Sequence, residues 1–130
     1  MKIRTIATWL LRVIAAVIML QTLYYKFTGS EESVHIFSTL GIEPWGRLAT
    51  GALELIASIL LLIPATTLIG ALLGVGLMSG AIASHLIFLG IEVQNDNGLL
   101  FAYALTVFFC CLTLIVMKRR ELRELLNRRK

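Results

Sequence analysis

Charged residues are scarce in this sequence: Asp, Glu, Lys and Arg make up 15% of its 130 residues, against about a quarter in typical soluble domains. The apolar residues AVILMFWYC make up 58%, and the mean hydropathy is +0.85. A soluble domain of this length could not bury so much apolar surface, because a soluble core helix is rarely apolar on every face. The composition therefore excludes a soluble domain and predicts a membrane protein.

Cysteine and histidine are scarce as well, which limits the redox and metal centres that the chain can build. The two cysteines, Cys110 and Cys111, are adjacent within an apolar run, so the sequence has neither a disulfide framework nor a CxxC redox pair. Of the two histidines, His35 belongs to a polar loop and His85 to an apolar run, which disfavours a bis-histidine haem site. No metal cluster or nucleotide-binding loop is recognisable. We therefore expect no metal and no resident cofactor.

Apolar runs, in contrast, are long. A helix that spans a bilayer takes about 20 consecutive apolar residues, and four runs satisfy this requirement. The sequence therefore predicts an all-α integral membrane protein, a multi-pass four-helix bundle. The expected spans extend from about Ile6 to Phe27, from just after Pro44 and Trp45 to near Ile63, from about Leu68 to Leu89, and from about Leu99 to Met117.

The two ends of the chain carry most of its positive charge. The first four residues, MKIR, hold two bases, and the tail KRRELRELLNRRK holds seven bases and two acids. The loops after the first and third spans are acidic instead, and the second of these loops has Glu92 and Asp96 without a base. Because Lys and Arg collect on the cytoplasmic side of membrane spans, we expect both the N and C termini to be cytoplasmic. The domains are then a transmembrane domain, 1–117, and a basic cytoplasmic tail, 118–130.

The tail also has an amphipathic pattern. Leu122, Leu125 and Leu126 share one helical face among the Lys and Arg residues. Two interpretations stay open: the tail continues the fourth span as a helix, or it lies along anionic lipid at the membrane surface. Because the tail stands beside a membrane, we expect the lipid bilayer, and not a nucleic acid, as its partner.

The segment between the first and second spans predicts a short helix on the external surface. Val34 and Phe37 have helical spacing within the stretch Glu32 to Leu40. Ser30, followed by acids, is a typical helix start, and Gly41 is a typical end. We expect this helix to cap the external side of the bundle.

The third predicted span is rich in small residues. Gly70 and Gly74 form one GxxxG pair, and Gly76 and Gly80 form another. Small residues let helices approach closely in lipid. In a chain with four spans, packing within the molecule is the favoured use of these glycines, and formation of an oligomer through them is the alternative.

Arg12 and Glu54 fall well inside predicted spans, where a charge costs about 2.5–3.5 kcal/mol on the insertion scale. Arg12 lies near the cytoplasmic end of the first span, so we expect its long side chain to reach the headgroups by snorkelling. Glu54 lies near the middle of the second span, too deep for its short side chain to reach either surface. Thr50 and Ser58 lie one turn on either side of Glu54 and extend a polar stripe. Glu54 therefore needs partners inside the bundle.

Polar residues of the other spans are expected to meet Glu54 in the outer half of the bundle, because the predicted topology places them near the external ends of those spans. Two interpretations stay open. Either Lys26 and Glu54 form a structural buried ion pair, or the whole group lines a pocket that binds a small molecule. The candidate pocket residues are Gln21, Tyr25, Lys26, Glu54, His85 and Tyr103.

Several stretches of the sequence combine into a recognisable pattern. Tyr25 and Lys26 end the first span, LGIEP closes the external segment, GALELIASILLLIP carries Glu54, and IGALLGVGLMSGAIASHL carries His85. Together these stretches resemble the DoxX family of small bacterial membrane proteins over roughly residues 10–117. The resemblance implies a four-helix fold in the bacterial cytoplasmic (inner) membrane, and it matches Lys26, Glu54 and His85 to the family's pattern.

The resemblance also implies a link to redox metabolism, because the family is named after a subunit of a thiosulfate:quinone oxidoreductase. In one interpretation the chain is a redox-linked membrane subunit that has a membrane oxidoreductase as partner and accepts a quinone-like or other lipophilic ligand. His85 or Tyr25 would then donate hydrogen bonds, and Glu54 would accept a proton. The alternative is a non-enzymatic protein: a small-solute or proton pathway, or an assembly factor for a membrane complex. Both interpretations stay open, and with them the question whether the chain is an enzyme.

Overall fold

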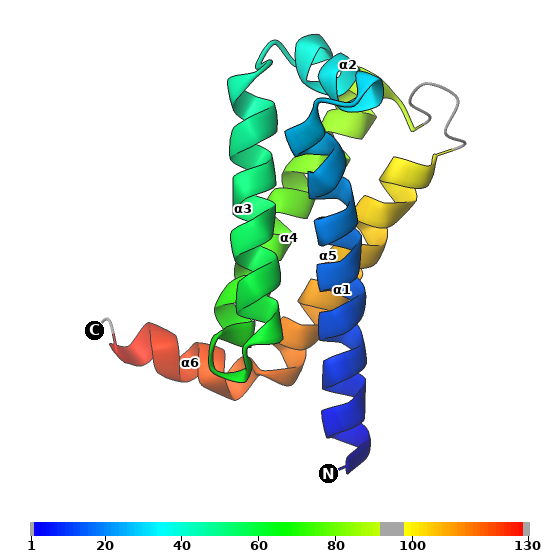
Figure 1. Ribbon diagram of the computed structural model, residues 1–130. Coiled ribbons are helices and arrows are strands. Elements are labelled where there is room, and N and C mark those ends of the chain that lie inside the picture. Colours follow the sequence, from blue (N-terminus) through cyan, green and yellow to red (C-terminus); the bar gives the residue numbers. More distant parts are fainter. Residues whose placement is uncertain (1, 92–97, 129–130) are drawn as a thin grey trace.

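Four long helices lie side by side and form the body of the molecule (Figure 1). The computed structural model describes residues 2–91 and 98–128. Each long helix belongs to a segment that is long and apolar enough to cross a membrane. The predicted all-helical fold with four membrane-length spans is thus confirmed for the described residues, whereas the cytoplasmic position of the termini stays a prediction. The long helices are α1 (Lys2–Thr28), α3 (Trp45–Leu62), α4 (Thr67–Ser84) and α5 (Leu99–Met117).

Shorter elements connect or extend these helices. The predicted third span is divided at His85, where regular α-helix changes to a π-helical turn. The Gly90 N–H donates to the His85 carbonyl oxygen with an N···O distance of 2.6 Å, which is the i+5 spacing of a π-helix. Gly90 then ends the turn with a φ of 80°, a conformation that glycine adopts without steric cost. The shorter elements are α2 (Glu31–Thr39), the 3-10 turn η1 (Pro64–Thr66), the π-helical turn η2 (His85–Leu89) and α6 (Arg119–Arg128).

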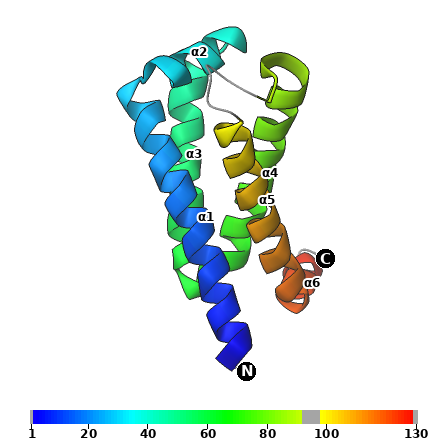
Figure 2. The same ribbon diagram turned by 90° about the vertical axis from the view of Figure 1, so that its right-hand side faces the viewer.

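The long helices pack in a ring, in which α1 contacts α3 and α5, and α4 contacts the same two helices. In Figure 2, the pair formed by α1 and α3 diverges from the pair formed by α4 and α5 toward the end that α2 covers. Both described ends of the chain lie at the opposite end of the bundle (Figure 1). We refer to these as the α2 end and the terminal end. The helices are therefore farther apart at the α2 end than at the terminal end.

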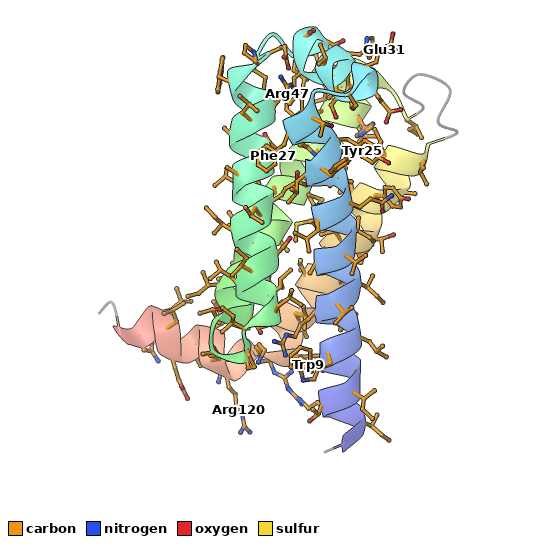
Figure 3. All side chains as sticks on the ribbon, in the orientation of Figure 1. Trp9, Tyr25, Phe27, Glu31, Arg47 and Arg120 are labelled. Carbon is orange, nitrogen blue, oxygen red and sulfur yellow. The ribbon has the colours of Figure 1, made fainter. Side chains whose placement is uncertain are left out.

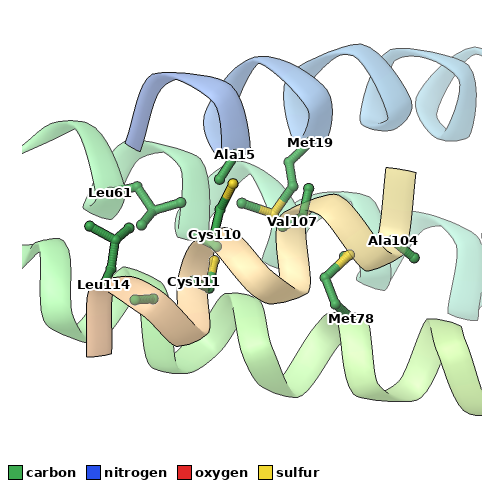
Figure 4. Packing of buried hydrophobic residues seen from close by; sticks show 11 residues of the cluster. Ala15, Met19, Leu61, Met78, Ala104, Val107, Cys110, Cys111 and Leu114 are labelled. Atoms are coloured by element: carbon green, nitrogen blue, oxygen red, sulfur yellow. The ribbon is translucent and has the colours of Figure 1, made fainter. Parts of the chain in front are cut away.

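An apolar cluster from all four long helices fills the centre of the bundle (Figure 4). Met19, Leu61, Val107 and Leu114 are fully buried in it. Cys111 is fully buried among them and is a free thiol, so it packs there as a small apolar side chain. The cluster separates the α2 end from the terminal end.

The glycines of α4 divide into two groups. A Cβ at Gly70 would lie 2.7 Å from a backbone nitrogen of α3, and a Cβ at Gly74 would lie 2.6 Å from the sulfur of Cys111 on α5. These two glycines therefore let α4 approach α3 and α5 closely, which is the internal packing favoured from the sequence. A Cβ at Gly76 or Gly80 would meet nothing within 4 Å among the described residues. Oligomerisation through α4 stays a prediction.

The structure contradicts the expectation that Arg12 snorkels to the headgroups. Its side chain is 3% exposed, and its guanidinium carbon lies 3.6 Å from the centre of the Trp9 ring. Arg12 Nε and Nη2 donate to the carbonyl oxygens of Leu61 and Leu62, at 2.6 and 2.8 Å. The last carbonyls of a helix lack intrahelical partners and attract a cation. Arg12 therefore joins α1 to the end of α3.

The short helix α2 lies across one end of the bundle (Figure 1), which confirms the helix predicted between the first two spans. The Ser30 hydroxyl accepts a hydrogen bond of 3.3 Å from a backbone N–H in the first turn, as an N-cap does. Behind α2, Arg47 Nε donates to Glu43 Oε1 at 2.7 Å. Arg47 Nη1 donates to the backbone carbonyl of Lys26, so the start of α3 is fixed to the end of α1.

The helix α6 runs across the bundle axis: it is seen from the side in Figure 1 and almost end-on in Figure 2. Lys118 ends α5 with a φ of −104° and a ψ of 26°, and the chain turns at this residue. The tail therefore does not extend the fourth span as one straight helix, and its contact with lipid stays a prediction. The loop acids Glu92 and Asp96 and the last two residues of the tail lie outside the described residues.

Candidate functional site

A cavity of about 800 Å³ lies at the α2 end of the bundle. Side chains of α1, α2, α3, α4, η2 and α5 line it. The fold thus brings all the candidate residues named from the sequence to the wall of one cavity, although they belong to different spans. These residues are Gln21, Tyr25, Lys26, Glu54, His85 and Tyr103.

Glu54 projects from the middle of α3 and is 2% exposed. Lys26 Nζ lies 2.8 Å from Glu54 Oε1, and the Lys26 side chain is 17% exposed. Thr22 Oγ1 donates to Glu54 Oε2 at 3.4 Å. Because Thr22 and Lys26 are one turn apart on α1, both face the same carboxylate. The structure contains the ion pair as well as the cavity, so the two interpretations of Glu54 do not exclude each other.

The Glu54 carboxylate keeps unused capacity for hydrogen bonds. Lys26 Nζ lies 2.8 Å from Oε1, and no other donor among the described residues meets this oxygen. An ionised carboxylate has about four acceptor positions, and leaving a buried acceptor unfilled is costly. A ligand hydroxyl or N–H at Oε1 would therefore gain a favourable hydrogen bond.

His85 supplies a second buried polar group, at the point where α4 passes into η2. It is 5% exposed, and its ring packs edge-on against Phe101 with the centroids 5.5 Å apart. His85 Nδ1 lies 3.0 Å from the carbonyl oxygen of Gly90. A carbonyl oxygen can only accept, so Nδ1 carries the hydrogen, and Nε2 of the neutral ring is then an acceptor. We expected His85 to donate a hydrogen bond to a ligand. Because Nδ1 donates to Gly90, the neutral ring offers a ligand the acceptor Nε2 instead.

Gln21, Tyr25 and Tyr103 are less buried than Glu54 and His85. Gln21 is exposed, Tyr25 is 48% exposed, and Tyr103 is half-buried. Tyr25 lies toward the α2 end of α1 (Figure 3), where its ring packs edge-on against Tyr24 at a centroid distance of 5.4 Å. A phenol hydroxyl can donate as well as accept. Tyr25 and Tyr103 therefore supply phenol hydroxyls to the wall of the cavity.

Some cavity residues are not among those predicted from the sequence. Thr22 touches Glu54, and its position one turn before Lys26 could have identified it. Gly76 and Gly80 also line the cavity and leave space where other residues would place a side chain. The helix α2 adds residues such as Ser33, and no pattern in the sequence shows how this helix is turned.

The deep part of the cavity is apolar. Met19, Met78 and Val107 line it and also belong to the buried cluster at the centre of the bundle. The residues that line the cavity stop at this level, and the fully buried Leu61 and Leu114 lie in the cluster beyond it. Within the described chain, the cavity therefore ends on packed core.

The cavity thus has an apolar inner wall. Its polar residues include one base and one acid that form an ion pair, together with donors and acceptors of hydrogen bonds. In the part of the chain that the structure describes, no three His, Cys, Asp or Glu side chains lie close enough together to hold a metal ion. The arrangement is suited to holding a small amphipathic molecule and to exchanging a proton with it.

Comparison with known families gives a match to the DoxX-like family over residues 10–116. The matched range includes Lys26, Glu54 and His85, the positions that the resemblance in sequence pattern singles out. No curated protein and no solved structure matched the chain. Because the family match extends over far more than half of the 130 residues, the chain belongs to the DoxX-like family.

Proposed function

We propose that this membrane protein of the bacterial inner membrane binds a small lipophilic molecule with a quinone-like head group in the cavity at the α2 end. The observation that carries the proposal is a cavity of about 800 Å³ in which the buried Lys26–Glu54 pair faces an apolar wall. Ligand pockets typically have volumes of about 300–1,000 Å³ and a few polar groups in a mostly apolar wall. The cavity agrees with this description in both size and chemistry.

The polar groups suit both redox forms of a quinone. The carbonyl oxygens of the oxidised head group would accept hydrogen bonds from Lys26 Nζ and from the hydroxyls of Tyr25 and Tyr103. The hydroxyls of the reduced head group would donate to Glu54 Oε1 and to Nε2 of a neutral His85. The apolar ring and tail would lie against the inner wall.

Interconversion of the two forms requires electrons as well as protons. We assign the exchange of electrons to a membrane oxidoreductase partner, which makes this chain a redox-linked subunit. Glu54 and His85 would exchange the protons; their burial and their position in the wall of the cavity support this role.

A conducting pathway for protons or small solutes has less support. Such a pathway would need polar groups or water along the whole bundle. Here the cavity ends at Met19, Met78 and Val107, and an apolar cluster follows within the described residues. We therefore favour a binding pocket.

The test is equilibrium binding of a tritiated short-chain ubiquinone analogue to the protein purified in mild detergent. We expect saturable binding that Glu54→Gln weakens about 10- to 100-fold, because a hydrogen bond to a charged group contributes about 1.5–3 kcal/mol. Glu124→Gln is the matched control, since Glu124 is an exposed carboxylate on α6, outside the cavity.

A second variant separates binding from folding. Gly80→Leu should abolish binding by filling the cavity, while it leaves the Lys26–Glu54 pair in place. Absence of saturable binding by the unmodified protein, or an equal loss in Glu54→Gln and Glu124→Gln, would refute the proposal.

A further inference from the structure

A second cavity lies at the terminal end, on the opposite side of the apolar cluster, and has a volume of about 460 Å³. The first turns of α1 and the corner between α5 and α6 form it. We name it the basic cavity. Its polar lining residues are Arg4, Thr8, Lys118, Arg119, Arg120 and Glu121.

Backbone carbonyls at the end of α5 hold two of its guanidinium groups. Arg4 Nη2 donates to the carbonyl oxygen of Met117, and Arg119 Nη1 donates to that of Val116 at 3.2 Å. The last carbonyls of a helix lack intrahelical partners, which makes them natural acceptors for cations. A guanidinium has five N–H donors, so each of these bonds leaves other donors for an anion.

The charge of the basic cavity is not balanced. Four of its lining residues are bases, and its acid, Glu121, lies 3.7 Å from Lys118 Nζ in a loose and partly exposed ion pair. Arg120 is exposed and makes no ion pair among the described residues, and Figure 3 shows its side chain extending from α6 away from the bundle. A group with several anionic oxygens, such as a phosphate ester, would bring the charge closer to balance.

The surroundings of the basic cavity are those of a membrane surface. Ile3 and Ile6 flank Arg4 on α1 and are 83% and 59% exposed. The amphipathic helix α6 leaves the cavity across the bundle axis (Figure 1), in the orientation of a helix that lies in the headgroup layer. Ile3 and Ile6 do not line the cavity but lie on the other sides of α1, so an anion bound here would stand next to a helix whose outer surface is apolar and exposed.

We propose that the basic cavity binds the phosphate headgroup of an anionic phospholipid, with the acyl chains along the exposed apolar side chains of α1. The apolar flank favours a lipid over a free phosphate ion, because a free ion gains nothing from Ile3 and Ile6. This site is separate from the cavity that contains Glu54, and it does not depend on the function proposed for that cavity.

The test uses the full chain in a zwitterionic detergent, with native mass spectrometry as the readout of lipid binding. The probes are phosphatidylglycerol and phosphatidylcholine with the same acyl chains, and inorganic phosphate alone. Arg120→Gln removes an exposed arginine that lines the basic cavity, and Arg123→Gln removes an exposed arginine of the same helix that does not. Among the described residues, neither arginine makes a side-chain hydrogen bond that its substitution would remove.

We expect phosphatidylglycerol to be retained in preference to phosphatidylcholine. Arg120→Gln should reduce this preference about fivefold, which corresponds to one basic residue near an anionic headgroup, whereas Arg123→Gln should change it less than twofold. Equal effects of the two substitutions would indicate diffuse surface attraction and would overturn the proposal. Absence of a preference, or displacement of the lipid by millimolar phosphate alone, would overturn it too.

Discussion

The ion pair between Lys26 and Glu54 connects α1 to α3 inside the membrane-spanning region, and its two members can be replaced separately or together. Nζ and Oε1 are 2.8 Å apart, with Glu54 almost fully buried and Lys26 slightly exposed. Lys26→Met removes the ammonium but keeps most of the side-chain length. Glu54→Gln keeps the shape of the carboxylate but removes its charge. The double variant removes both charges and leaves no ion without its partner.

The expected free energies follow from this burial. Removing one partner of a buried ion pair costs about 3–5 kcal/mol, because the remaining charge is left uncompensated. We expect about 3 kcal/mol for Lys26→Met, which strands the buried carboxylate. Glu54→Gln should cost about 1–2 kcal/mol, since the long Lys26 side chain can turn toward water. The double variant should cost about 1–2 kcal/mol, which gives a coupling energy of about 2–4 kcal/mol.

The assay is reversible unfolding by SDS in mixed micelles, followed by circular dichroism, for the unmodified protein and the three variants. The free energy of unfolding of each protein completes a double-mutant cycle. If the costs of the two single substitutions add to that of the double variant within about 0.5 kcal/mol, the ion pair has no energetic role. The reasoning from burial would then be refuted.

Other contacts give predictions for the same unfolding assay. Gly70→Ala should lower the free energy of unfolding by about 1–3 kcal/mol, because its Cβ would lie 2.7 Å from the backbone of α3; Gly76→Ala, in open space, should change it by less than about 1 kcal/mol. Arg12→Gln should cost about 2 kcal/mol, because two carbonyls of α3 lose a charged donor; a neutral result would show that lipid or water replaces it. Ser30→Ala should cost about 1 kcal/mol through loss of the N-cap of α2, and it should increase hydrogen exchange in that helix.

The membrane spans and the contact between Lys26 and Glu54 could be predicted from the sequence. Each avoids a large free-energy cost: exposure of long apolar runs to water, or an unpaired carboxylate inside the membrane. Apolar runs of this length are typical of membrane spans and not of soluble proteins. The bounds expected for the spans agree with the helices to within a few residues. A carboxylate in the middle of such a run requires a partner. Lys26 is a base within reach at the end of the neighbouring span, and the structure places it there.

The partner of Arg12 could not be predicted in the same way. Hydropathy gives the depth of a residue along the membrane normal, but not the rotation of its helix. At the depth of Arg12, the headgroups and the free carbonyls of Leu61 and Leu62 are both available to a guanidinium. Only the packing of α1 against α3 decides between them. The tautomer of His85 likewise depends on the turn at Gly90, which no sequence period shows.

The surroundings of the glycines of α4 could not be predicted from the sequence either, because they too depend on how the helix packs against its neighbours. Both GxxxG pairs have the same spacing. The space beside Gly70 and Gly74 is occupied by α3 and α5, whereas Gly76 and Gly80 border the cavity. The two pairs are offset by six residues, so at about 100° per residue they lie on different faces of α4. The helices also diverge toward the α2 end (Figure 2), which leaves space beside the second pair. The space lies on the wall of the cavity that also contains Glu54. The helix α4 therefore has glycines on two faces: one pair lets the bundle close beyond the buried carboxylate, and the other leaves space beside the carboxylate, which is the combination that a binding pocket inside a four-span protein requires.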